Sequence, residues 1–104
     1  MSRNLTSREE LEKKLRESLD EAEWAWIQNH ATRGAVVIAD HPLNLIEVGV
    51  EIAEDNTQAI ENWIQTGKLS KPSTVQLETW NLDPSRKFRC LVLQPYVLIQ
   101  EIVQ

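Results

Sequence analysis

The sequence predicts an α+β domain with a long N-terminal helix, a small sheet of about three strands, and two or three short helices packed on one side. Three patterns support this class. Apolar residues recur at helical spacing before Gly34, a short β-branched run follows that glycine, and a dense apolar run extends from Phe88 to Val103. A chain of 104 residues can build one core without staples, so we treat residues 1–104 as a single domain.

Composition sets the broad class of the protein. With 41% hydrophobic and 26% charged residues, the chain has the balance of a folded globular protein. The single cysteine, Cys90, cannot form an intramolecular disulfide or make a metal site by itself. Residues 1–6 are polar, and we expect them to be disordered. The sequence shows no signal-peptide pattern and no apolar run long enough to span a membrane. We therefore expect a cytoplasmic protein.

Charge is distributed unevenly along the chain. Residues 34–66 contain no Lys or Arg and six acidic residues, within a chain of net charge −5. Such a surface repels phosphate backbones, which argues against sequence-independent nucleic-acid binding. It favours a basic partner or a cation instead.

The first helix is expected to begin at Ser7, which forms a capping box with Glu10, and to continue without interruption towards Gly34. Its apolar face consists of Leu11, Leu15, Leu19, Ala22 and Trp26. Trp24 falls outside this stripe, so it lies either in a second packing face or on the surface. An exposed tryptophan often marks a binding surface.

Residues 35–39 (AVVIA) predict a buried strand, which the Asp40-His41-Pro42 turn ends. The segment 44–54 fits two structures. Alternating Val and Glu residues fit a strand, whereas Asn44 as a cap and an apolar face with helical spacing fit a helix. We favour the helix, in which Gly49 would allow close packing on a neighbour.

Two further helices follow. One starts near Thr57 and stops at Gly67, and the next is capped by Ser73. The closing run is too long for one strand of a small domain, and Pro95 removes a ladder donor. We therefore expect an inner strand at Phe88–Leu93 and a separate outer segment at Tyr96–Val103.

Several stretches of the sequence resemble a known family. They are EAEWAWI at 21–27, LNLIEVGVEIAEDN at 43–56, the Trp63, Gly67, Leu69, Lys71-Pro72 pattern, and LQPYVLIQ at 93–100. Together they resemble domain of unknown function 2288, a family of small bacterial proteins common in cyanobacteria and proteobacteria. The resemblance implies a free-standing domain in a bacterial cytoplasm and carries over no catalytic residue.

Candidate chemistry is sparse. On a helical 44–54, Glu47, Glu51 and either Glu54 or Asp55 would share one face, at a spacing that could hold a hard cation. Asp40 and His41 could form an acid–base pair after the first strand. The four acids are equally explained as the solvated face of an amphipathic helix, and Asp40 and His41 as an ordinary turn. We therefore expect no metal, cofactor or catalytic group.

The sequence as a whole favours a non-enzymatic interaction module. We expect neither nucleic acid nor a membrane as its partner. We expect it to self-associate as a homodimer through the C-terminal extended segment or the first helix, because an extended apolar segment can pair across a two-fold axis. A further protein partner is also open. The expected interface residues are Tyr96, Leu98, Ile99, Ile102 and Trp24. The alternatives are a small metal-assisted or acid–base enzyme that uses the acidic cluster, and a small-molecule sensor with a Trp-lined pocket.

Overall fold

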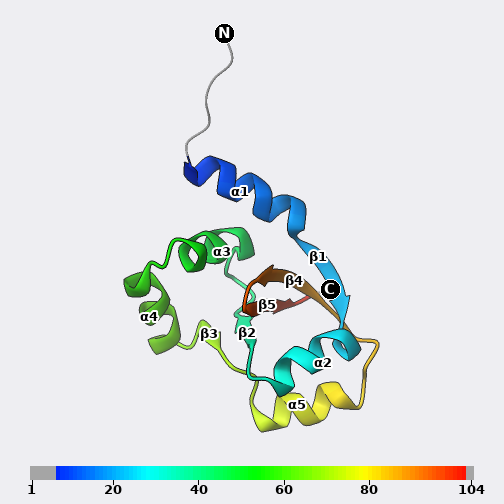
Figure 1. Ribbon diagram of the computed structural model, residues 1–104. Coiled ribbons are helices and arrows are strands. Elements are labelled where there is room, and N and C mark those ends of the chain that lie inside the picture. The colour runs from blue at the N-terminus through cyan, green and yellow to red at the C-terminus, as the bar shows by residue number, and fades with distance from the viewer. Residues whose placement is uncertain (1–6, 103–104) are drawn as a thin grey trace.

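The computed structural model describes residues 7–102 and confirms the α+β class (Figure 1). Within this range the helices are α1 (Ser7–Ser18), α2 (Trp24–Thr32), α3 (Leu45–Ala53), α4 (Thr57–Gln65) and α5 (Thr74–Asn81). The strands are β1 (Asp20–Glu23), β2 (Val36–Ala39), β3 (Leu69–Ser70), β4 (Lys87–Leu93) and β5 (Tyr96–Glu101). None of the described helices has the length and apolarity to cross a membrane. The expectation of disorder at 1–6 lies outside the described residues.

The sheet is larger than the sequence predicted. The described residues form five strands in the order β1-β4-β5-β2-β3, where about three were expected. Strand β5 pairs antiparallel with β4 and parallel with β2, whereas β1 and β3 form the two edges. The expectation that Tyr96–Val103 is an outer segment is wrong for its described part, because β5 occupies the middle of the sheet. Its residues Val97, Leu98 and Ile99 are buried by the strands on both sides and by the helices above and below.

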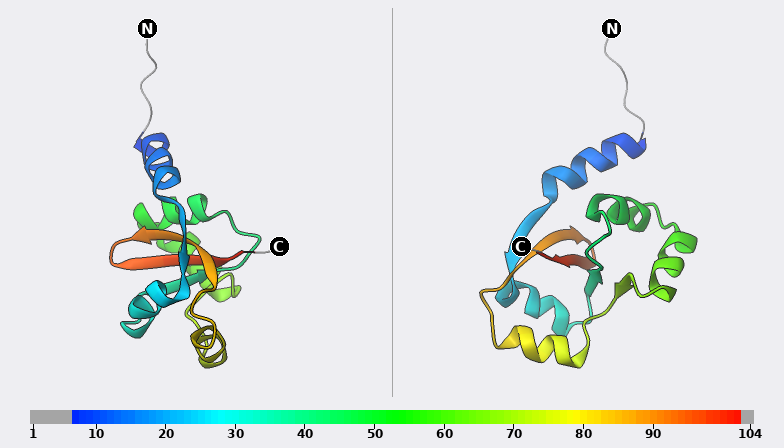
Figure 2. Two further views of the ribbon diagram at one scale, coloured as in Figure 1. Left: turned by 90° about the vertical axis from the view of Figure 1, so that its right-hand side faces the viewer. Right: turned by 180° about the vertical axis from the view of Figure 1, so that it is seen from behind.

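Helices cover both faces of the sheet, which corrects the expectation that they pack on one side (Figure 1). Alternation along β5 explains this arrangement. Leu98 points into a cluster formed with α1 and α3, whereas Val97 and Ile99 point into a second cluster formed with α2 and α5. In the side view of Figure 2, the β4–β5 hairpin runs between these two helical layers.

The expected long N-terminal helix is interrupted. Helix α1 has 12 residues, and strand β1 separates it from α2. No glycine or proline causes this break; tertiary pairing overrides helix propensity. In the register with β4, Glu21 lies opposite Arg89 and Glu23 lies opposite Lys87, so acidic residues face basic ones.

The interruption changes which of two tryptophans is buried. Trp24 is fully buried, and its Nε1 donates a hydrogen bond to Asn81 Oδ1 at 2.8 Å. Trp26, expected in the core on a continuous helical stripe, is 46% exposed and contacts His30 in a tilted arrangement with ring centroids 4.6 Å apart. Starting a new helix at residue 24 changes which side chains face the sheet.

Several local predictions are confirmed. The favoured helix at 44–54 is α3, with the Asn44 side chain accepting hydrogen bonds from the backbone at its N-terminus. Ser73 and Gln76 form the capping box of α5. The final run breaks at Gln94-Pro95, a cis peptide bond between β4 and β5. Gly49 packs closely, because a Cβ there would lie 2.7 Å from Leu91 Cδ2.

Candidate functional site

An apolar groove of about 570 Å³ lies where α3 and α4 meet the sheet, and we call it the α4 groove. Strand residues form its floor and helix residues form its wall. The apolar lining comprises Val37, Leu69 and Leu98 from the strands, and Ile52, Ile60 and Ile64 from the helices. The floor residues belong to the same face of the sheet as the cluster under α1 and α3. The groove is therefore a part of this face that the helices leave accessible.

The local backbone explains why α4 leaves this space. Asp55 has a φ of 55°, in the left-handed region, and turns the chain from α3 into α4. Gly67, with a φ of 76°, ends α4 before the chain enters β3. Helix α4 has no fully buried residue, and Ile64 is 56% exposed. The helix therefore stands at the margin of the sheet rather than over it.

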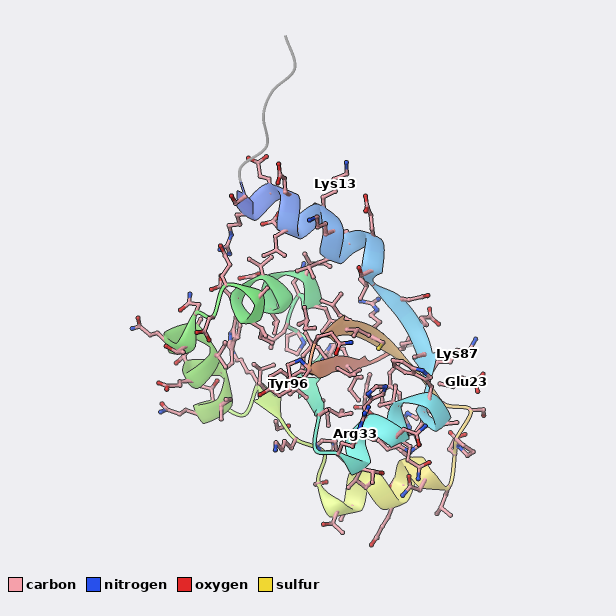
Figure 3. All side chains as sticks on the ribbon, viewed as in Figure 1. Lys13, Glu23, Arg33, Lys87 and Tyr96 are labelled. Atoms are coloured by element: carbon pink, nitrogen blue, oxygen red, sulfur yellow. The ribbon has the colours of Figure 1, made fainter. Side chains whose placement is uncertain are left out.

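Polar groups surround the apolar lining. Tyr96, at the start of β5, is 45% exposed, and Figure 3 shows it on the side of the sheet that faces α4. Asp55, in the turn between α3 and α4, and Glu61, on α4, contribute carboxylates. Lys71 also lines the groove, and its ammonium lies 4.0 Å from the position that a Cβ on Gly34 would take. The site thus combines an apolar interior with a few charged groups, as ligand sites generally do.

The acidic residues of α3 do not form the cation site that was considered from the sequence, because a side chain of α1 contacts them. Arg8 of α1 donates to Glu51 Oε1 and to Glu54 Oε1, each at 2.6 Å, and Asn56 donates to the other oxygen of Glu51. These hydrogen bonds from Arg8 and then Asn56 hold the pKa of Glu51 below its usual range. The same contact with Glu51 raises the pKa of Arg8. An intramolecular cation therefore occupies the place that the sequence suggested for a metal.

The other two acids of that set lie apart from this ion pair. Glu47 is exposed in the first turn of α3, and Asp55 belongs to the α4 groove. Across residues 7–102, no group of three or more His, Cys, Asp or Glu side chains is arranged to hold a metal ion. Arg8 is the residue that sequence reasoning missed, because nothing local links residue 8 to residues 51 and 54.

Asp40 and His41 lie in an exposed loop outside the groove. Asp40 Oδ1 accepts a hydrogen bond from the His41 backbone N–H at 3.0 Å, as in an ordinary turn. The buried Gln100 side chain donates from Nε2 to the carbonyl oxygens of Asp40, His41 and Leu43, at 3.0, 3.3 and 2.7 Å. These contacts give the loop a structural role.

The residues expected to meet a partner occupy different environments. Trp24, Leu98 and Ile99 are fully buried within the fold, so they present no surface to another chain. Ile102 is half-buried, and Tyr96 borders the α4 groove. The groove itself contains no tryptophan, in contrast to the Trp-lined pocket considered from the sequence. Its helical wall could not be foreseen, because Ile60 and Ile64 have the spacing of ordinary core residues.

Comparisons with known proteins agree with this fold. A family model described as "Protein of unknown function (DUF2288)" matches residues 10–101. The solution NMR structure of PA1075 from Pseudomonas aeruginosa is similar, with 28% sequence identity and a TM-score of 0.76. That similarity covers 99% of this chain and 95% of PA1075. None of the curated proteins matches this chain.

Proposed function

This chain belongs to the DUF2288 family, and we propose that it is a non-enzymatic interaction module whose binding surface is the α4 groove. The observation that carries this proposal is the exposure of large apolar side chains at an apolar concavity. Ile64 is 56% exposed and Tyr96 is 45% exposed, and both border the groove. Exposed apolar surface that is gathered around a hollow is typical of a binding site.

The size of the groove supports binding of a compact apolar group. Its volume of about 570 Å³ falls within the range of roughly 300–1,000 Å³ typical of ligand pockets. The acidic cluster on α3 gives no comparable support for an enzyme, because Arg8 forms ion pairs with both Glu51 and Glu54. Binding is therefore the function that the geometry favours.

Nile red titration tests the proposal, because this uncharged dye fluoresces more strongly in apolar surroundings. We expect saturable binding to the wild-type protein. Ile64→Lys should weaken it about fivefold, since partial loss of an apolar contact is worth roughly 1 kcal/mol. Val75→Lys is the matched control, because Val75 is 71% exposed on α5, outside the groove. Absence of saturation, or equal loss in both variants, would refute the α4 groove as the binding surface.

We also propose self-association, through a route different from the one expected from the sequence. The pairing of β1 with β4 ends at Asp20 opposite Cys90, so no strand within residues 7–102 pairs with the outer side of Leu91–Leu93. Val92, in that segment, is 41% exposed. An open strand edge is a template for pairing, and two copies could align antiparallel about a two-fold axis.

Light scattering coupled to size-exclusion chromatography tests this second proposal. At high micromolar concentration we expect a dimer for the wild-type protein and a monomer for Val92→Lys, because lysine on an edge disfavours strand pairing. Leu82→Lys is the control, since Leu82 is 88% exposed and follows α5. A monomeric wild-type protein at that concentration would rule the dimer out.

A further inference from the structure

We propose that the α4 groove takes a basic amphipathic helix of a partner protein, which inserts aliphatic side chains and places Lys or Arg residues against the helical wall. This inference rests on the proposed function and specifies the chemistry of the occupant. Recognition of an amphipathic helix by an apolar groove is a recurrent mode of peptide binding. The charge and the size of the groove favour this occupant.

The wall of the groove is acidic. Helices α3 and α4 lie within residues 34–66, which contain six acids and no Lys or Arg. Two of these acids, Asp55 and Glu61, line the groove and are exposed. Neither forms an ion pair with another residue of the described range. Their charges are thus available to a ligand.

The single cation of the lining does not neutralise them. Lys71 forms no ion pair with Asp55 or Glu61 within residues 7–102. Its ammonium lies beside Gly34, just beyond the C-terminal end of α2. A partner cation would therefore find two uncompensated carboxylates next to an apolar surface. Complementary charge of this kind selects the partner and its orientation.

The volume of the groove sets how much of a helix it can accept. A helix about 10 Å across rises about 5.4 Å per turn, which corresponds to about 420 Å³ per turn. The groove of about 570 Å³ exceeds the volume of one complete turn, so it has room for the side chains that two successive turns direct towards it. Aliphatic residues at positions i, i+3 or i+4, and i+7 supply such a set of anchors.

Two synthetic peptides test this inference directly. Both carry the same aliphatic residues at i, i+4 and i+7, with Lys and Gln at the other positions of one peptide and Glu and Gln in the other. Fluorescence anisotropy of the labelled peptides gives their Kd values. We expect the basic peptide to bind at least tenfold more tightly than the acidic one. Its affinity should fall at high salt, because exposed charge pairs are screened.

A pair of variants locates the binding. Glu61→Lys should raise the Kd of the basic peptide about fivefold and lower that of the acidic peptide, because an exposed pair contributes up to about 1 kcal/mol. Glu78→Lys changes the net charge equally but lies on α5, outside the groove. It should leave both Kd values unchanged.

The outcomes separate this inference from the proposed function. Equal binding of both peptides would overturn the basic occupant, while apolar binding in the groove would stand. Saturable Nile red binding without peptide binding would overturn the helix as occupant and leave a small-molecule site. Identical effects of Glu61→Lys and Glu78→Lys would show non-specific attraction and overturn the inference. Failure of both the dye and the peptides would refute the proposed function as well.

Discussion

Replacement of Gly49 by Ala tests the close packing of α3 against β4. A Cβ at this position would lie 2.7 Å from Leu91 Cδ2 and 3.2 Å from Leu15 Cδ1. Leu91 is fully buried, so its side chain cannot move into solvent. Overpacking of a core costs about 1–3 kcal/mol, whereas Gly→Ala within a helix gains about 1 kcal/mol. We expect a net loss of up to about 2 kcal/mol, measured by urea unfolding.

A double-mutant cycle isolates that contact. Leu91→Val removes the atoms that the new methyl group would meet, and by itself costs about 1 kcal/mol. In the double variant, the effects of Gly49→Ala and Leu91→Val should not add, because the second change relieves the first. We expect a favourable coupling of at least 1 kcal/mol. Additivity within about 0.5 kcal/mol, or a clear stabilisation by Gly49→Ala alone, would refute this account of the packing.

Gln100→Leu should lower the free energy of unfolding by about 1–3 kcal/mol, because three loop carbonyls lose their hydrogen-bond donor. Proteolysis within the 40–43 loop should become faster in the same variant. Desolvation, then the charge of Asp20, raises the pKa of Cys90 to about 11, so at pH 8 the native thiol should react with Ellman's reagent only as fast as the protein unfolds. An immediate reaction without denaturant would contradict the burial. Arg8→Met should lower the free energy of unfolding at neutral pH. Because the pKa of Glu51 is lowered in the fold, the difference in stability between the wild-type protein and the variant should disappear as the pH falls below about 4. A difference in stability that does not depend on pH would contradict that origin.

Local signals in the sequence predicted individual elements well. Asn44 and Ser73 identified the starts of two helices, because capping depends only on residues within one turn. Pro95 identified the break in the final run, because a proline acts on its own backbone. Each of these features is decided within a few residues of the chain.

Features that depend on distant partners were not predictable from such signals. Strand β1 exists because β4 pairs with it, and the burial of Trp24 follows from that pairing and from Asn81 in α5. The candidate site shows the same limitation. Tyr96 was expected at a surface for binding, yet its neighbours in the α4 groove come from α3, α4 and β3, which the sequence could not place beside it.

The order of the strands has a consequence for synthesis of the protein. Strand β5 joins β4 to β2, but it follows both of them in the chain. Until β5 emerges during translation, the pair formed by β2 and β3 and the pair formed by β1 and β4 have no strand between them. A domain assembled from such distant contacts folds late and slowly. Without β5, the nascent chain would therefore leave Val36, Ile38 and Phe88 without the strand residues that pack against them.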